Sequence, residues 1–326
     1  MEIQFIKCHG SGNDFVLIDE VRNGPLFSNE SDRSAFAIAL SDRNGLVGSD
    51  GVLFLGTSDI CDYSMRMFNT DGSEAEMCGN GIRCLGRLAS EKSGKESFYI
   101  EVQGKSFFMK KEKPLGAGVA TYSVKIEDVI FDPARLPMIT DKQQFIDELI
   151  PVISDQLNFT ATGMPNPHLV SFIDGMDEAS MDEELISLGN KIIAEKPTFP
   201  NGFNVSLSKE ILPGRIFTRT YERGVGLTNA CGTAMCASAV TYTLMEHEQV
   251  NRWIDVVNKG GMVKCLVEKS GNRTDVTLLG NATFVYSASL SYSPSNGKID
   301  SINNRREHSE ENQAYETLLE ELRSIH

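Results

Sequence analysis

Two short segments each place a cysteine directly before a small polar turn at the start of an expected helix. The first, "EMCGNGIRC", spans residues 76–84 and contains Cys78, and the second, "NACGTAMC", spans residues 229–236 and contains Cys231. A helix N-terminus presents unpaired N–H groups and a partial positive charge, which stabilise a thiolate and attract a carboxylate. Two such thiols beside one carbon would suit moving a proton from one face of that carbon to the other, with one cysteine as base and the other as acid.

The chain has seven cysteines, an odd number, and no close pair of the spacing used in structural zinc sites. We therefore expect mostly free thiols, no disulfide framework and no metal. Free cysteine is also a common buried filler of protein cores. We interpret five of the cysteines in that way, namely Cys8, Cys61, Cys84, Cys236 and Cys265.

Polar side chains that could bind a ligand occur in several loops rich in Gly, Asn and Asp. Each one alone is an ordinary turn former, so only their number points to a site. The candidates are Asn13, Asn69, Asn166, His168, Asn204, Glu222 and Arg223.

The elements that must position these residues alternate between strands and helices. Stretches such as "YSMRMFN" and "GRIFTRTY" alternate in polarity and predict strands. Helical periodicity follows each cysteine, in "GIRCLGRLASEK" and in "TAMCASAVTYTLMEH", and the second is apolar or small nearly all round, which suits a helix wrapped by a sheet. Further helices are expected at residues 31–42, 141–154 and 180–194.

The surroundings of both cysteines follow the same order along the chain: a strand, a polar loop, the cysteine, a turn and a helix. This repeat predicts two similar halves. We place the first half at residues 1–128, with Cys78. The second half, with Cys231, covers residues 129–292, and its last strand could pack back on the first. Residues 293–326 are interpreted as a polar linker and an amphipathic C-terminal helix, because Tyr315, Leu318, Leu319 and Leu322 follow helical spacing and Ser309 could cap its start.

Composition restricts the class of function. The 326 residues carry a formal net charge of −14, with no cluster of Lys and Arg, which argues against binding nucleic acid or an anionic membrane. The N-terminus lacks a basic segment followed by an apolar stretch, and no window is long and apolar enough to span a bilayer. We expect a cytoplasmic protein that acts on a small molecule.

With these segments in place, the sequence resembles the diaminopimelate epimerase family over residues 1 to about 290. The resemblance rests on "KCHGSGNDFVLID", "GSDGVLF", "MRMFNTDGSEAEMCGNGIRC", "GMPNPHLVSF", "FPNGFNV", "YERGVGLTNACGTA" and "KGGMVKCLV", in the family's order. It implies an α+β fold of two pseudo-symmetric domains, each a curved, mostly antiparallel sheet wrapped around a central helix, with the active site in the cleft between them. It also implies a homodimer and a cofactor-independent isomerase that converts LL-diaminopimelate to the meso isomer, in lysine and peptidoglycan precursor synthesis.

The resemblance also assigns roles to individual residues. Cys78 and Cys231 would be the catalytic pair. The N–H groups that would bind the reacting carboxylate belong to Gly79, Asn80, Gly232 and Thr233. The contacts to the distal end of the substrate would come from Asn13, Asn69, Asn166, Asn204 and Arg223, with Glu222 facing an ammonium group and His168 in support. Three positions depart from the family's pattern, namely Pro165, Leu227 and Ala234.

Two alternatives remain beside this interpretation. One is another cofactor-independent amino-acid racemase of the same fold, but a substrate without a distal carboxylate would leave Arg223 unpaired. The other is a redox-sensing thiol protein that binds a ligand without turning it over, which the absence of a close CxxC pair disfavours.

Overall fold

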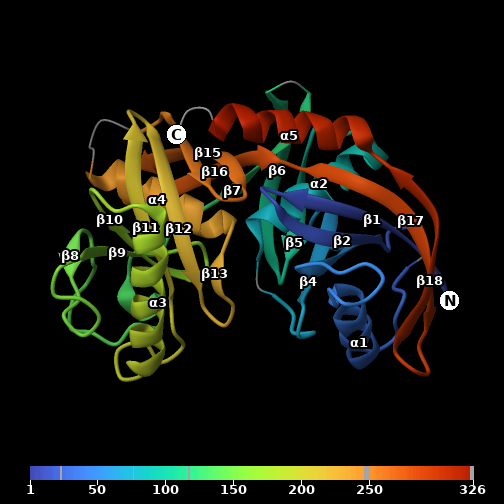
Figure 1. Cartoon of the computed structure of the whole chain (residues 1–326), viewed down its shortest axis with the longest axis horizontal. Coiled ribbons are helices and arrows are strands. Elements are labelled where there is room, and N and C mark those ends of the chain that lie inside the picture. Colours follow the sequence, from blue (N-terminus) through green and yellow to red (C-terminus); the bar gives the residue numbers. More distant parts are fainter. Residues whose placement is uncertain (23, 76, 117, 246–249, 324–326) are drawn as a thin grey trace. The chain divides into compact units, whose positions relative to one another are not determined.

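The computed structural model describes residues 1–22, 24–75, 77–116, 118–245 and 250–323 and is drawn in Figure 1. The chain divides into two compact units. Unit 1 comprises Met1–Val124 and Leu279–His326, and unit 2 comprises Lys125–Leu278. The boundaries that we expected from the sequence, after residues 128 and 292, therefore differ from those of the structure, most of all at the C-terminal side.

Unit 1 contains a mixed sheet with helices on it. Its elements are β1 (Glu2–Gly10), β2 (Asn13–Asp19), α1 (Glu30–Ser41), β3 (Gly51–Gly56), β4 (Tyr63–Asn69), α2 (Gly79–Ser93), β5 (Ser97–Val102), β6 (Lys105–Leu115), β17 (Thr283–Ser293), β18 (Lys298–Glu307) and α5 (Ser309–Arg323). Strands β7 (Val119–Ile126) and β16 (Arg273–Asn281) carry the chain between the units.

The strands of unit 1 run in the spatial order β18, β17, β1, β2, β3, β4, β5 and β6. The β2–β3 and β4–β5 pairs are parallel, and the other pairs in this series are antiparallel. Helix α2 packs against β1, β2, β3, β4 and β6, so the curved sheet wraps around it, as Figure 1 shows for this unit. Burying α2 on nearly every side supplies the hydrophobic stabilisation that its mixed sequence could not supply as an isolated helix.

Local sequence explains where α2 begins and ends. Cys78 caps its N-terminus in an extended conformation, and Gly94 ends it with a left-handed φ of 72°. Gly86 lets the helix approach the sheet, because a Cβ at this position would lie 2.7 Å from the methyl group of Met109.

Unit 2 has the same kinds of element. They are η1 (Pro133–Arg135), β8 (Glu148–Leu149), β9 (Asn158–Gly163), β10 (Pro167–Phe172), α3 (Glu178–Ala194), β11 (Asn204–Leu212), β12 (Arg215–Glu222), β13 (Gly226–Thr228), α4 (Gly232–Met245), β14 (Trp253–Asn258) and β15 (Gly261–Ser270). Strands β9, β10, β11, β12, β14 and β15 pair in this order, and β13 pairs with the end of β12.

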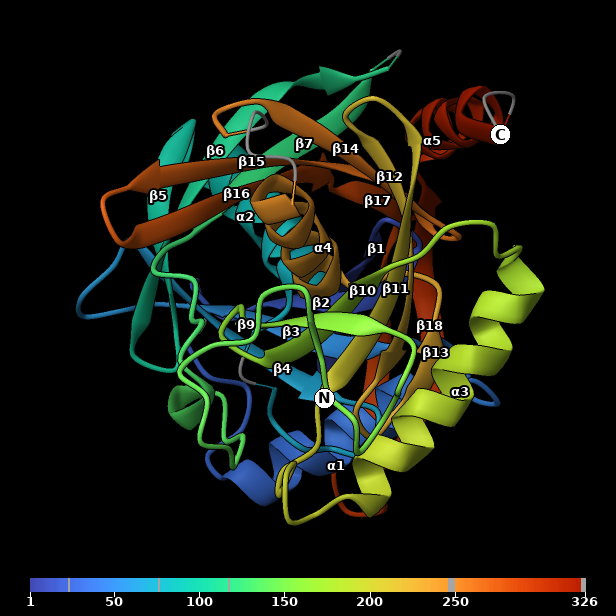
Figure 2. The ribbon, with the colours of Figure 1, turned by 90° about the vertical axis from the view of Figure 1, so that its left-hand side faces the viewer.

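Helix α4 lies at the centre of unit 2. It contacts β9, β10, β11, β12, β14 and β15, and these strands surround it in Figure 2. Every residue from Gly232 to Thr243 is buried, as its apolar sequence predicts. The expected end of this helix, residues 246–247, lies outside the described residues.

The two units repeat one topology. In each unit, two antiparallel strands are followed by a helix and by a third strand that lies parallel to the second. A fourth strand lies antiparallel to the third, and a second helix connects it to a fifth strand that lies parallel to it. Thus β1, β2, α1, β3, β4, α2, β5 and β6 correspond to β9, β10, α3, β11, β12, α4, β14 and β15. Aligning the parallel registers makes Asn13 equivalent to Asn166, Phe15 to His168, Asp50 to Phe203 and Gly51 to Asn204. The α+β fold and the repeat predicted from the sequence are confirmed.

One predicted helix is wrong. Residues 141–154 form irregular backbone and the short strand β8 instead. Pro151 lacks an N–H and cannot continue a helix, and Asp147 has a φ of 51°. The N–H of Ala161 donates to the carbonyl of Phe145 at 2.9 Å, and Glu148 pairs with Phe159, so this segment pairs its backbone with β9 rather than with itself.

The predicted polar linker after residue 292 is also wrong in part. Strand β17 runs to Ser293, and β18 then pairs antiparallel with it before α5 begins at Ser309. Ile299 and Ile302 pack against the core of unit 1, which places this Asn- and Ser-rich segment at the sheet edge despite its low strand propensity. In α5, Tyr315, Leu318 and Leu322 are buried, as their spacing predicts.

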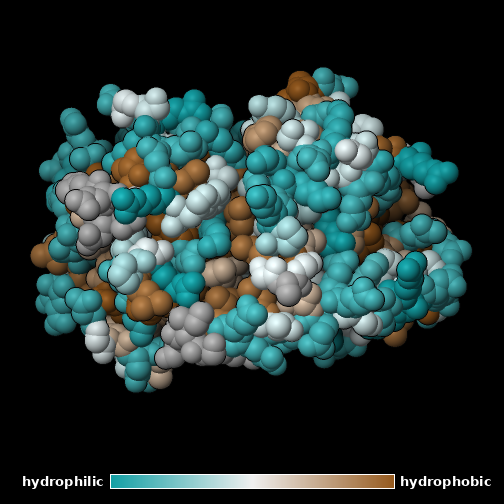
Figure 3. All heavy atoms as spheres, turned by 90° about the horizontal axis from the view of Figure 1, so that it is seen from above, coloured by the Kyte–Doolittle hydropathy of each residue, from teal (hydrophilic) through white to brown (hydrophobic). Residues whose placement is uncertain are grey.

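The surface shown in Figure 3 is mostly hydrophilic, with scattered hydrophobic residues. Within the described residues, no helix combines the length and apolar character that crossing a membrane requires.

Candidate functional site

Cys78 stands at the N-terminus of α2. Its Sγ accepts a hydrogen bond from the N–H of Gly81 at 3.4 Å, so the thiol is itself the capping group of the helix. The side chain is partly exposed. Gly81 allows this cap, because a Cβ there would lie 2.9 Å from Leu53. A sulfur in this position is stabilised as a thiolate by the helix N–H groups and by the helix dipole.

Two predicted binding residues lie beside Cys78. The Oδ1 of Asn13 lies 3.9 Å from the Cys78 Sγ, a long contact of a thiol with an acceptor, and it also accepts from the Asn80 Nδ2 at 3.3 Å. Gly79 is the first residue of α2, so its N–H is among those that the helix leaves unpaired. Asn69 ends β4, where its amide donates to the Ser73 hydroxyl at 3.0 Å. The structure therefore joins Asn13, Asn80 and Cys78 by contacts, whereas the Asn69 side chain contacts Ser73 in the turn after β4.

A fully buried arginine of α2, Arg83, is not among the site residues that the sequence predicts. Arg83 donates to the carbonyl of Gly79 at 2.8 Å and to the Asn80 Oδ1 at 3.0 Å, and its Nε donates to the carbonyl of Asn281. It thus ties the first turn of α2 to the end of β16. The sequence gives no separate signal for Arg83, because an arginine in a helix is ordinary until its partners are known.

Cys231 directly precedes α4, at the position equivalent to Cys78. It is only 8% exposed, and its Sγ lies 3.5 Å from the Thr233 hydroxyl. Burial, together with the nearby carboxylate of Glu222, raises the pKa of the Cys231 thiol well above its ordinary value, although Thr233 and the N–H of Ala234 partly oppose this. Cys231 is therefore protonated at neutral pH, whereas its equivalent in unit 1 caps a helix and is partly exposed.

His168 supports the Thr233 hydroxyl. Its Nε2 lies 3.1 Å from the Thr233 Oγ1, and the side chain is completely buried. Burial, with the charge of Arg223 as a second cause, lowers the pKa of His168 to about 3, so the ring is neutral. The Nδ1 of His168 and the Oδ1 of Asn166 are buried without a hydrogen-bond partner among the described residues. Buried polar atoms of this kind are usually satisfied by water or a ligand.

Asn204 and Arg223 meet at the ends of β11 and β12. The N–H of Arg223 donates to the Asn204 Oδ1 at 2.9 Å, and the guanidinium donates to the carbonyl of Asn201 at 3.1 Å. Glu222 precedes Arg223 at the end of β12, which corresponds to Asn69 at the end of β4 in unit 1. Unit 2 therefore brings Cys231, Thr233, His168 and Glu222 together, and Asn204 and Arg223 adjoin them, since Asn204 pairs with His168 between β10 and β11 and the charge of Arg223 acts on His168.

The three departures from the family's pattern all lie in unit 2. Pro165 follows Met164 through a cis peptide and directly precedes Asn166. Leu227 pairs with Tyr221 in the β12–β13 ribbon, and Ala234 is buried in the first turn of α4.

The other cysteines differ in their surroundings. All seven are free thiols, and Cys8, Cys84, Cys236 and Cys265 are buried, whereas Cys61 is partly exposed. Among the residues that the structure describes, no three His, Cys, Asp or Glu side chains gather so that they could hold a metal ion.

Several known proteins are similar to this chain. The model of the family described as diaminopimelate epimerase matches residues 5–113 and 160–285. A diaminopimelate epimerase of Clostridium acetobutylicum is 41% identical over 89% of this chain and 86% of its own. One of Ligilactobacillus salivarius is 39% identical over 98% of this chain and 99% of its own, so that match includes the C-terminal segment.

Among solved structures, the fold is shared more widely. A Bacillus anthracis phenazine biosynthesis protein of the PhzF family superposes with a TM-score of 0.62 at 15% identity, over 89% of this chain and 99% of that one. A hydroxyproline epimerase of Agrobacterium vitis superposes with a TM-score of 0.62 at 12% identity, over 90% and 91% of the two chains. These structural similarities show only a shared fold, whereas the sequence matches show the family. The chain belongs to the diaminopimelate epimerase family, a family of isomerases.

Proposed function

We propose that the protein is a cofactor-independent epimerase that inverts one centre of LL-diaminopimelate to give the meso isomer, for lysine and peptidoglycan precursor synthesis. The observation that carries the proposal is the occurrence of a cysteine at the N-terminus of the buried helix in both units, at Cys78 and Cys231. The family supports the substrate, since relatives at about 40% identity over most of the chain are named for it. We also propose that the protein is cytoplasmic and acts as a homodimer, as the family resemblance implies.

The different surroundings of the two sulfurs support different roles. Cys78 receives the Gly81 N–H and would act as the thiolate that removes the α-proton. Cys231, kept protonated by burial and Glu222, would deliver its thiol proton to the opposite face of the carbanion. The step is balanced, because Cys78 ends as a thiol and Cys231 as a thiolate. Exchange with solvent or the reverse reaction resets the pair.

The remaining predicted residues would bind the substrate. The N–H groups of Gly79, Asn80, Gly232 and Thr233 would neutralise the reacting carboxylate, which lowers the barrier to removing the adjacent proton. The distal end would be read by Asn13, Asn69, Asn166, Asn204 and Arg223, with Glu222 facing an ammonium group. The buried Asn166 Oδ1 and His168 Nδ1 supply acceptors or donors that a ligand could satisfy, with His168 in a supporting position.

Incubating the reduced protein with LL-diaminopimelate and resolving the stereoisomers tests this function. Cys78→Ala and Cys231→Ala should each lower the rate by at least about 100-fold, the usual minimum for losing a positioned acid or base. Cys84→Ala and Cys265→Ala are matched controls at buried cysteines and should stay within a few-fold of the wild-type rate. Near-full activity in either of the first two variants would rule out the two-thiol mechanism.

The same assay with a panel of single-centre amino acids separates the alternatives. Inversion of another amino acid with none of diaminopimelate would identify a racemase of the same fold, and Pro165, Leu227 and Ala234 would be the first residues to examine. Reversible thiol oxidation without inversion of any amino acid would identify a redox sensor.

A further inference from the structure

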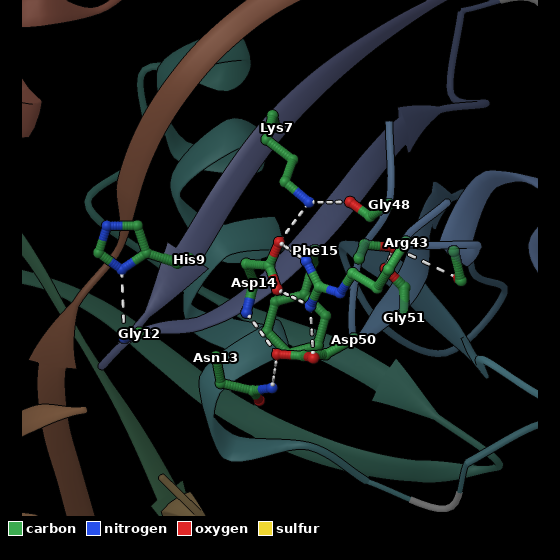
Figure 4. A network of polar contacts seen from close by, with 12 residues as sticks. Lys7, His9, Gly12, Asn13, Asp14, Phe15, Arg43, Gly48, Asp50 and Gly51 are labelled. Atoms are coloured by element: carbon green, nitrogen blue, oxygen red, sulfur yellow. Dashed lines mark hydrogen bonds and ion pairs between the residues drawn. The ribbon is translucent and has the colours of Figure 1, made fainter. Parts of the chain in front are cut away.

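The amide of Asn13 is held in one orientation. Its Nδ2 donates to the Asp50 Oδ2 at 2.7 Å, which leaves its Oδ1 directed at the Asn80 Nδ2 and the Cys78 Sγ. Figure 4 shows the Asn13 amide against the Asp50 carboxylate. Turning the amide over would bring its oxygen against the carboxylate and its NH2 against the NH2 of Asn80. Both contacts would be repulsive, so the orientation shown is strongly preferred.

Charged groups anchor both ends of this chain of amides. Arg43 donates to the Asp50 Oδ1 at 2.6 Å and also bridges to the carboxylate of Asp14, whose N–H donates to the Asp50 Oδ2 at 3.0 Å. These ion pairs are drawn in Figure 4. At the other end, the buried Arg83 donates to the Asn80 Oδ1, so the Asn80 amide must direct its NH2 at Asn13. Charge-assisted hydrogen bonds are the stronger kind and give direction as well as stability.

Unit 2 lacks this arrangement. The residue equivalent to Asp50 is Phe203, which is buried and carries no acceptor. Asn166, the equivalent of Asn13, has a buried Oδ1 with no hydrogen-bond partner among the described residues. The carboxylate that orients the asparagine therefore serves unit 1 alone, beside the more exposed of the two predicted catalytic cysteines.

We propose that Asp50, held by Arg43, is a positioning residue that acts through Asn13 to balance Cys78 between its thiol and thiolate forms. The carbonyl of Asn13 accepts from the S–H and favours the thiol, whereas the N–H of Gly81 donates to the sulfur and favours the thiolate. A group that serves as base in one direction of a reversible reaction and as acid in the other needs both forms within reach. This role rests on the proposed proton transfer at Cys78.

The rate at which iodoacetamide alkylates Cys78, followed by mass spectrometry of its peptide near neutral pH, measures the thiolate without any substrate. Asp50→Asn removes one of the two contacts that orient the Asn13 amide, so the amide can turn its NH2 to the sulfur part of the time. We expect alkylation of Cys78 to rise by about three-fold or more, of the order that one ordinary hydrogen bond supplies. Asp62→Asn is a matched control, because Asp62 also pairs with a cation and accepts a backbone N–H, at Lys95 and Tyr99. It should leave the rate unchanged.

Two further variants separate positioning from simple charge. In an Asn13→Ala background, Asp50→Asn should have no further effect if Asp50 acts through Asn13. Arg43→Gln removes a cation, and by charge alone this would destabilise the Cys78 thiolate and slow alkylation. The substitution also releases Asp50 and with it the Asn13 amide, so we expect alkylation to become faster. An equal effect of Asp50→Asn with and without Asn13, or slower alkylation in Arg43→Gln, would overturn the proposal.

The activity assay then distinguishes this inference from the proposed function. If the protein epimerises diaminopimelate, Asp50→Asn should lower kcat by about ten-fold and change the pH profile of kcat while KM changes less, because the balance of Cys78 is disturbed. If no amino acid is inverted, the alkylation results still decide whether Asp50 positions Asn13. Circular dichroism spectra and thermal melts show whether each variant is folded, and Asp50→Glu should restore part of the wild-type alkylation rate if the carboxylate is what matters.

Discussion

The buried, neutral state of His168 makes the stability of unit 2 depend on pH. The pKa of His168 is about 3 in the folded protein, because of burial and Arg223, against an ordinary value of 6.5. Between these values the unfolded chain binds more protons, so folding stability rises with pH. The contribution is complete above about pH 6.5 and is lost as the pH falls toward 3. Because the unfolded chain takes up one proton at His168 that the folded protein does not, the free energy of unfolding is lower by about 2 kcal/mol at pH 5 than at pH 7.5.

His168→Gln removes this titration and keeps an amide that can reach Thr233. Trp253, the only tryptophan, lies in unit 2, so its fluorescence follows the unfolding of the unit that contains His168. In urea titrations, the wild type should lose about 2 kcal/mol more than His168→Gln between pH 7.5 and pH 5. His308→Gln, in unit 1, should behave as the wild type. Equal pH dependence of the Trp253 transition in the wild type and His168→Gln would refute the assignment of a neutral buried imidazole.

Three further predictions concern other parts of the chain. Gly189→Ala should destabilise the protein by about 1–3 kcal/mol in urea unfolding, because a Cβ there would lie 2.5 Å from the Tyr221 ring, and this outweighs the gain in helix propensity of about 1 kcal/mol. An unchanged or higher stability would contradict that packing. Glu311→Gln should cost about 2 kcal/mol in thermal or urea melts followed by circular dichroism, since Glu311 forms a bidentate pair with the buried Arg87 of α2, whereas Glu310→Gln, on the exposed side of α5, should cost little. Prolonged dialysis against a chelator should leave epimerase activity unchanged, and loss of activity that zinc restores would contradict a mechanism without a metal.

The sequence predicted the parts of the fold that repeat a pattern. Both cysteine motifs, the strands before them and the apolar helix around Cys236 follow regular periods, and the structure contains these elements. The sequence predicts a helix at residues 141–154, but Pro151 and the left-handed backbone of Asp147 interrupt it, and the segment pairs with β9 instead. Strand β18 escaped notice because Ser and Asn dominate it, and only pairing with β17 makes it a strand.

For the candidate site, the sequence predicts the residues that stand in recognisable motifs but not the residues that support them. Cys78 and Cys231 stand out because glycine-containing turns mark the starts of α2 and α4. Arg83 and Asp50 gave no separate signal, because a charged residue in a helix or a turn is ordinary until its partners are known. Their roles depend on contacts with residues far away in the sequence, such as Arg83 with Asn281.

The central claim, separate roles for two thiols, is tested most directly by epimerisation in D2O. The thiol that delivers a proton has exchanged with solvent, whereas the base that removed the original proton is on the wrong side to return it. At a few per cent conversion, mass spectrometry should therefore find deuterium at the inverted carbon of the product and almost none in the remaining LL-diaminopimelate. Product that retains substantial protium would indicate a single base that serves both faces, and it would contradict the assignment of acid and base to Cys231 and Cys78.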